Sequence, residues 1–170
     1  MSNKITLLIF LLLFFVKIVA IYFTSFNLFG DEAQYWLWSN NLSFGYFSKP
    51  PLLAWFINIH TTLFGDMFFS LKIFPSIVYF IICFAIYSLC KNIGLKSSDA
   101  VYCSILFLII PAVSFSSYVV STDLLLLLFW TLSLNILVKI KQNPTLINFV
   151  TLGIMIGLAF LSKYAAVYFL

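Results

Sequence analysis

Charged side chains are scarce in this sequence, and arginine is absent from it. Only 8% of the residues are charged and 64% are hydrophobic, with a mean hydropathy of +1.12. A soluble domain needs far more polar surface, whereas apolar runs of about 20 residues are what a membrane-spanning helix requires. The lysines behind the net charge of +4 are scattered, which argues against nucleic acid as a partner and against a polybasic lipid-binding patch. We therefore expect an integral membrane protein.

Metal-ligating residue types are also few. His60 is the single histidine, and the three cysteines, Cys83, Cys90 and Cys103, lie in or beside apolar runs without metal-site spacing. We expect the cysteines to be small core residues and His60 to be a satisfied polar residue on a helix. The sequence contains no glycine-rich nucleotide loop and no nucleophile elbow. It indicates neither a cofactor nor a metal, although a divalent ion would be compatible with it.

The apolar runs provide for about five spans and leave no room for a separate soluble domain. We expect one all-α module over residues 1–170, a polytopic membrane helical bundle. The predicted spans are residues 5–28, 67–90, 100–118, 124–140 and 145–170, and short interfacial helices are predicted at 31–41 and 52–64 within a long outer loop, 30–66. Pro111 predicts a kink in the third span. We expect Lys17, near the middle of the first span, to face the bundle interior or to snorkel, the alternative being a direct functional role.

The distribution of lysines predicts the topology. Alternating spans place one group of lysines on one side of the membrane (Lys4, Lys91, Lys96, Lys139, Lys141) and a smaller group on the other (Lys49, Lys72). The lysine-rich side should be cytoplasmic, together with the N-terminus. The long loop and the start of the fourth span then share the outer face. We expect four residues that are distant in sequence to converge there: Asp31, Glu32, Lys49 and Asp123. Lys163 is expected to lie towards the same face.

Each acid in this group has a structural and a functional interpretation. Asp31 with Gln34 resembles a capping box, but a partly desolvated carboxylate can also act as a general base on a hydroxyl. Glu32 is the weaker candidate, because it complements the dipole of a short helix. Asp123 follows Ser121 and is either a helix cap or a functional acid at the start of an apolar span.

Lys49 precedes two prolines, a pattern that predicts a helix beginning directly after it. A lysine beside the free N–H groups of a helix N-terminus is suited to binding phosphate. The alternative is a lysine that snorkels to the lipid head groups. The sequence leaves both possibilities open.

Four motifs in order carry a family resemblance: FGDEAQYWLWSNNLSFGYFSKPPLLAWFI, LFGDMFFSLKIFPS, STDLLLLLFW and GLAFLSKYAAVYF. Together they closely resemble the N-terminal part of the family 39 type glycosyltransferases, which have the type C membrane fold. That family includes bacterial relatives of protein mannosyltransferases and the aminoarabinose transferase of lipid A. The resemblance extends over essentially the whole chain.

The resemblance implies an inverting transferase of the bacterial inner (plasma) membrane, which moves a sugar from a polyprenyl-phosphate donor to a lipid, glycan or protein acceptor on the outer face. The matching acids imply catalytic roles for Asp31, Asp123 and Glu32, and the matching basic motifs imply donor-phosphate binding by Lys49, Lys72, Lys163 and Tyr164. Lys72 replaces the arginine usual in relatives, and a lysine lacks the planar fork of a guanidinium. Ser48 stands where the aminoarabinose branch often has an acid, which argues against that sugar.

Members of this family are considerably longer than 170 residues. We therefore expect a truncated or split gene product, with a second chain supplying the missing C-terminal part. One alternative is an inactive remnant or partner subunit that binds polyprenyl phosphate without catalysis. A small transporter subunit is a further alternative, but it would place its acids in a midplane cavity, whereas Asp31 and Asp123 are predicted at span ends.

Overall fold

The computed structural model describes residues 3–24, 27–65 and 68–169, with side chains from Leu7 onward. Within these ranges the chain is helical and contains no strand, which confirms the all-α prediction. Two helices, Phe68–Asn92 and Thr122–Gln142, are long and apolar enough to cross a membrane by length and composition, and shorter apolar helices accompany them. Large apolar side chains are exposed along the first and last long helices, as the surface of a membrane bundle requires.

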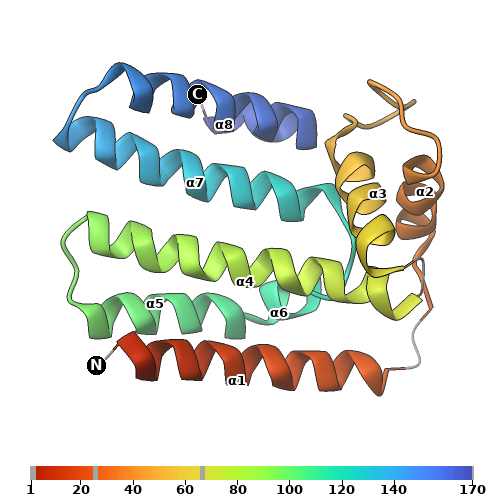
Figure 1. Cartoon of the computed structure of the whole chain (residues 1–170), viewed down its shortest axis with the longest axis horizontal. Helices are drawn as coiled ribbons and strands as arrows, with labels where there is room; N and C mark the ends of the chain where they lie inside the picture. The colour runs from red at the N-terminus through yellow and green to blue at the C-terminus, as the bar shows by residue number, and fades with distance from the viewer. Residues whose placement is uncertain (1–2, 25–26, 66–67, 170) are drawn as a thin grey trace.

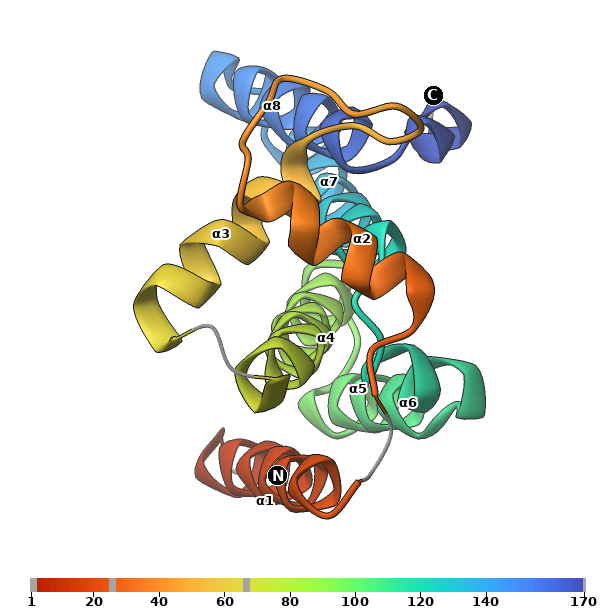
Figure 2. The ribbon, with the colours of Figure 1, turned by 90° about the vertical axis from the view of Figure 1, so that its right-hand side faces the viewer.

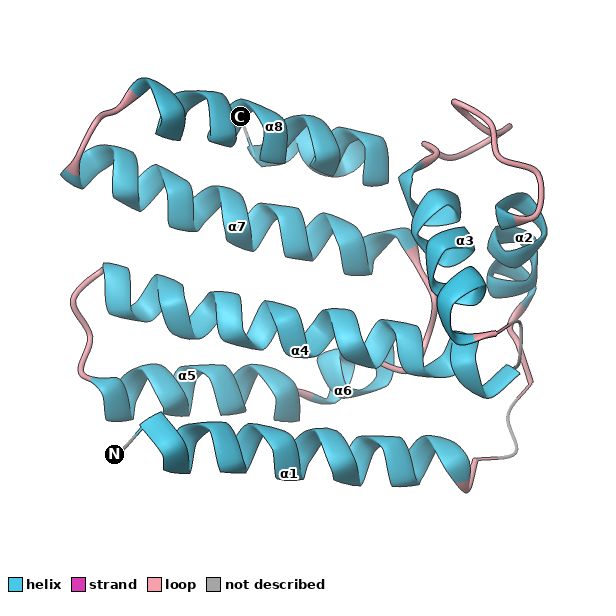
Figure 3. Ribbon diagram, viewed as in Figure 1, coloured by secondary structure: helices cyan, strands magenta, loops and turns pink. Residues whose placement is uncertain are grey.

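The long helices run side by side, and two short ones lie across one end of the bundle (Figures 1 and 2). The elements are α1 (Asn3–Tyr22), α2 (Gly30–Ser39), α3 (Leu52–Phe64), α4 (Phe68–Asn92), α5 (Ser97–Ile109), α6 (Pro111–Ser116), α7 (Thr122–Gln142), α8 (Leu146–Ser162) and the 3₁₀ helix η1 (Tyr164–Phe169). Central α4 packs against α1, α3, α5 and α7, and α8 packs on α7. The connections gather at the two ends of the bundle (Figure 3). We call the end crossed by α2 and α3 the α2–α3 end.

Three predicted spans have different boundaries in the structure. The first helix ends at Tyr22 and not near residue 28, and the last ends at Ser162 and not near residue 170. The predicted third span is broken into α5 and α6. Pro111 is the reason for the break, because proline lacks an N–H and its ring clashes with the preceding turn, so it serves as the first residue of α6. The two interfacial helices lie where they were predicted.

The structure also settles several smaller expectations. Lys17 lies on the inner side of α1 and donates to the Ser114 carbonyl oxygen at 2.5 Å. Cys83 and Cys90 are buried, but Cys103 is exposed, so its assignment to the core was wrong. Asp66, at the end of the predicted outer loop, lies outside the described residues.

A polar clamp joins α4 and α7 away from the α2–α3 end. The buried Asn135 side chain donates to the carbonyl oxygens of Ala85 and Thr131, and its own oxygen accepts from Asn92 Nδ2 at 3.1 Å. Gln142 adds a bond to the Asn92 carbonyl oxygen at 2.6 Å. Polar bonds between apolar helices fix their register, because dispersion alone leaves sliding inexpensive.

Replacing Asn135 with alanine should therefore lower the free energy of unfolding by about 1 kcal/mol, the usual range for an interhelical hydrogen-bonding side chain in a membrane. Thermal unfolding of the purified chain in detergent measures the change. The matched control is Thr151→Val, because the Thr151 hydroxyl bonds only the Ile147 carbonyl of its own helix. Equal stability of the two variants would contradict the clamp.

Candidate active site

Glu32 is buried at the start of α2 and joins three parts of the chain. Its Oε2 accepts a hydrogen bond from the Phe29 N–H at 2.8 Å and one from Lys72 Nζ at 2.6 Å, and its Oε1 accepts from the Val120 N–H at 2.7 Å. The Glu32 and Lys72 side chains are both 0% exposed. This arrangement attaches the start of α2 to α4 and to the segment that leads into α7.

The capping box predicted for Asp31 and Gln34 was therefore wrong. The N-cap residue of α2 is Phe29, and Glu32, in the first turn, accepts from the Phe29 N–H. Phenylalanine has no side-chain acceptor, so the glutamate provides the cap interaction alone. Asp31 is consequently not needed to cap the helix.

Glu32 and Lys72 were predicted to serve in catalysis and in phosphate binding, respectively. In the structure they are each other's partners and have no exposed side-chain surface. Lys72 also lies over aromatic rings, with Nζ 5.0 Å from the Tyr118 centroid and 5.3 Å from that of Phe29. In this geometry neither residue has a surface on which to contact a substrate.

Asp31 and Asp123 lie at the same end of the bundle, as predicted, although they are far apart in sequence. Both are exposed. Burial first, and then the negative charges of Asp31 and Asp123, raise the pKa of Tyr35. Both carboxylates are thus within electrostatic reach of one buried phenol. Asp31 forms no ion pair with the residues that the structure describes, so its carboxylate is available.

Asp123 has a partner in Lys163, whose Nζ lies 2.6 Å from Asp123 Oδ1. The two side chains are 51% and 32% exposed, respectively. Lys163 follows the last residue of α8 in an extended conformation and precedes η1, so it projects where the chain changes direction. Tyr164, the next residue, is 67% exposed. The expected position of Lys163 near the acids is confirmed.

Lys49 lies at the base of a loop, residues 40–51, that we call the aromatic loop. Leu52 and Leu53, just after it, belong to the same buried cluster as Leu124 of α7 and Ala159 of α8. This packing places the loop at the end of the bundle that carries Asp123 and Lys163. The Lys49 side chain is partly buried.

The aromatic loop is held by its own side chains. The Tyr46 ring stacks on Trp38 with centroids 4.6 Å apart, and Tyr46 Oη accepts from the Ser43 N–H at 3.2 Å. Trp55 Nε1 donates to the Ser43 carbonyl oxygen at 2.9 Å. Phe44 and Phe47 are left 91% and 102% exposed. Sequence analysis did not single out these two residues, and their one signal was the number of aromatic residues in the stretch.

His60 is a satisfied buried residue, as predicted. Its Nε2 lies 2.9 Å from the Ser70 carbonyl oxygen and 3.1 Å from Ser70 Oγ. Burial lowers the pKa of His60, with a smaller opposing effect from the bond to Ser70. Within the part of the chain that the structure describes, no three His, Cys, Asp or Glu side chains gather as a metal would require.

The helical membrane bundle carries a free carboxylate and an acid–lysine pair at one end, and these groups form the candidate active site of a membrane protein. Residues 48–170 match the dolichyl-phosphate-mannose-protein mannosyltransferase family, and the chain belongs to that family. The resemblance found in the sequence is therefore confirmed.

The chain is also similar to the lipid A galacturonosyltransferase RgtD of Rhizobium johnstonii. The two are 31% identical over 169 residues, which cover 99% of this chain and 36% of that protein. The chain thus spans about a third of the length of this relative. No solved structure matches.

The buried ion pair gives a stability prediction. Lys72→Met should lower the free energy of unfolding by about 3–5 kcal/mol, because it leaves the Glu32 carboxylate buried without its counter-ion. Adding Glu32→Gln should recover part of the loss, since the double variant has no unpaired buried charge. Thermal unfolding in detergent measures the stability of the Lys72→Met variant and of the double variant. Lys96→Met, at an exposed lysine, is the control and should change stability little. A double variant as unstable as the sum of the two single ones would argue against the pairing.

Proposed function

We propose that the chain is the N-terminal module of a membrane glycosyltransferase that takes a sugar from a polyprenyl-phosphate donor. The observation that carries the proposal is the arrangement at the α2–α3 end, where an unpaired exposed carboxylate, Asp31, shares its surroundings with the Asp123–Lys163 pair. Family membership supports the reaction class. The substrates are inferred from the family resemblance and from the chemistry of the rim.

In the proposed reaction the acceptor hydroxyl oxygen attacks C1 of the donor sugar. Its proton passes to the Asp31 carboxylate, and the bond between C1 and the phosphate oxygen breaks. The electron pair of that bond leaves with the lipid phosphate, and attack from the opposite face inverts the anomeric centre. A carboxylate within reach of the attacking hydroxyl is a suitable general base.

The two acids differ in their ion pairing, and we propose different roles for them. Asp123 is compensated by Lys163, whereas Asp31 has no cation partner among the described residues. Asp123 Oδ1 already accepts a hydrogen bond from the Lys163 ammonium, so Asp123 is less available than Asp31 to take the acceptor proton. Asp31 is therefore the proposed base, and Asp123 orients Lys163 or the acceptor.

The leaving phosphate needs positive charge, and two lysines at this end can provide it. Lys163 uses one ammonium hydrogen on Asp123, which leaves two for a phosphate oxygen. Lys49 precedes the start of α3, and the exposed Tyr164 adds a hydroxyl. Glu32 and Lys72 are proposed as positioning residues, because their buried ion pair fixes the backbone near Asp31 and Asp123.

The acceptor is proposed to be a lipid. The name of the relative RgtD specifies lipid A as its acceptor, and Phe44 and Phe47 present an apolar surface beside the proposed site. Two fully exposed phenylalanines on a well-bonded loop are costly in water and are favourable against acyl chains.

Asp31→Asn should abolish sugar transfer, because the amide cannot accept the acceptor proton. Protein in vesicles is assayed with a labelled polyprenyl-phosphate sugar. The matched control is Asp99→Asn, which alters an exposed acid at the opposite end of the bundle. Undiminished transfer by the Asp31 variant would remove the assignment.

The alternative of a binding subunit without catalysis makes a different prediction for the same material. Under this alternative the unmodified protein binds lipid phosphate but transfers no sugar. The Lys49→Met variant should then bind lipid phosphate more weakly. The observation that favours it is the pair of lysines, Lys49 and Lys163, at the α2–α3 end, because they suit phosphate binding whether or not transfer follows.

We further propose that the α2–α3 end faces outward from the inner membrane, since most lysines lie towards the other end. In a background lacking Cys83, Cys90 and Cys103, a Ser48→Cys variant should react with an impermeant maleimide in intact spheroplasts. A Lys96→Cys variant should react only after lysis. Both positions are exposed, so the difference reports sidedness, and the reverse pattern would invert the topology.

A further inference from the structure

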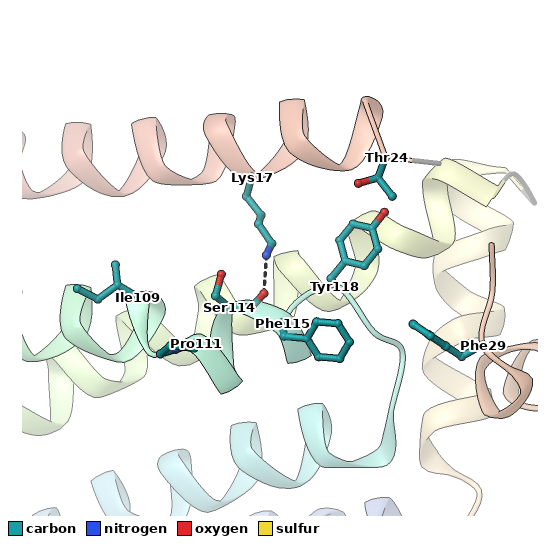
Figure 4. Close-up of a pocket in the computed structure, with 8 residues that line it drawn as sticks. All are labelled: Lys17, Thr24, Phe29, Ile109, Pro111, Ser114, Phe115 and Tyr118. Carbon is teal, nitrogen blue, oxygen red and sulfur yellow. Dashed lines mark hydrogen bonds between the residues drawn. The ribbon is translucent and has the colours of Figure 1, made fainter. Parts of the chain in front are cut away.

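A cavity of about 590 Å³ lies between α1 and the break that separates α5 from α6 (Figure 4), and neither Asp31 nor Asp123 lines it. Its walls include the aromatic side chains of Phe29, Phe115 and Tyr118. The proposed reaction uses none of its lining residues. The polar groups in it therefore need a separate explanation.

Lys17 reaches into this cavity from α1 (Figure 4). Its ammonium group donates to the Ser114 carbonyl oxygen at 2.5 Å and lies 6.0 Å from the centroid of the Tyr118 ring. It has no acidic partner among the described residues. An ammonium group has three donors, so two remain for a ligand.

One hydroxyl group in the cavity is also free to donate. Tyr118 Oη is buried and has no hydrogen-bond partner among the described residues, which is costly unless a ligand or water supplies one. The Thr24 side chain lines the same cavity. A cation without a counter-ion, together with the unpaired Tyr118 hydroxyl, favours an anionic group with several acceptor oxygens.

A second cavity of about 400 Å³ adjoins the first and shares Lys17, Ile109 and Ser114 with it. Its other walls are mainly apolar, with Leu13, Val16, Phe80 and Leu108 among them. The combination of an anion site and an apolar extension matches a lipid with a charged head and an acyl chain. Lys17 is five residues from the end of α1, about 8 Å along the axis, a depth that a snorkelling lysine spans.

The site is open at its rim. Phe115 and Ile109, on its rim, are 62% and 57% exposed. The rings of Phe29 and Tyr118 separate it from Lys72, whose Nζ lies over both. Neither cavity is lined by Asp31, Asp123 or Lys163. A donor phosphate bound here would be without the acids that the proposed reaction requires. A bilayer phospholipid that only binds does not require those acids.

We propose that this Lys17 groove binds an anionic phospholipid of the leaflet at the α2–α3 end. The phosphate contacts Lys17 Nζ and the hydroxyls of Thr24 and Tyr118, and one acyl chain follows the second cavity. The inference depends on the membrane location of the chain and not on its proposed glycosyl transfer. The lipid adds to the Lys17 hydrogen bond that joins α1 to Ser114 of α6.

The test measures lipid binding to the purified chain in detergent by native mass spectrometry and by thermal shift. Phosphatidylglycerol, phosphatidylcholine and undecaprenyl phosphate are the probes. We expect phosphatidylglycerol to bind at least tenfold more tightly than phosphatidylcholine. Lys17→Met should abolish this preference, whereas Lys91→Met, at an exposed lysine outside both cavities, should preserve it.

Tyr118→Phe provides a second variant that keeps the ring and removes only the hydroxyl. It should weaken phosphatidylglycerol binding severalfold without changing helix content, so a folding defect in the Lys17 variant does not decide the result. Unchanged binding in both variants overturns the site. Equal binding of phosphatidylcholine overturns the charge assignment, and stronger Lys17-dependent binding of undecaprenyl phosphate overturns the phospholipid assignment. Transfer activity is not part of the readout, so failure here is separate from failure of the proposed function.

Discussion

The buried carboxylate of Glu32 is the constraint on which the geometry of the α2–α3 end depends. A charge removed from water is tolerated only when donors surround it, and Glu32 has two backbone N–H groups and the Lys72 ammonium. Asp31 is its neighbour in sequence, and Asp123 follows three residues after Val120. One side chain that contacts no reacting group therefore fixes both candidate carboxylates.

The two ion pairs of this end have the same chemistry and opposite environments. The Glu32–Lys72 pair is fully buried, and breaking it would leave a charge without solvent. The Asp123–Lys163 pair is partly exposed, and such pairs contribute about 0–1 kcal/mol, so an anionic ligand could replace the carboxylate at little cost. The buried pair is therefore suited to stabilising the fold, and the exposed pair is suited to binding a ligand.

Much of this arrangement could be predicted from the sequence, because hydropathy and span alternation assign each residue to one end of the bundle. They placed Asp31, Asp123 and Lys163 together. They could not reveal the Glu32–Lys72 partnership, since it depends on how α2 crosses α4 and not on any local spacing. The cap of α2 was misassigned because Asp31–Gln34 and Phe29–Glu32 have the same spacing, and only the second forms. The end of α8 at Ser162 could not be predicted, because the apolar run continues past this residue without a break in hydropathy.

Lys17 and Pro111 each look unfavourable alone and compensate one another in the fold. The break at Pro111 makes α6 a short helix, whose last carbonyl groups lack intrahelical partners. Ser114 contributes one of these carbonyl oxygens, and it accepts hydrogen bonds from Lys17 and from the Ser117 hydroxyl. An unpaired lysine in the membrane and an unpaired carbonyl at a helix break are both costly, and their contact reduces both costs. The remaining donors of Lys17 then explain why a charged ligand fits beside an apolar channel, at a place where hydropathy alone predicts only lipid contact.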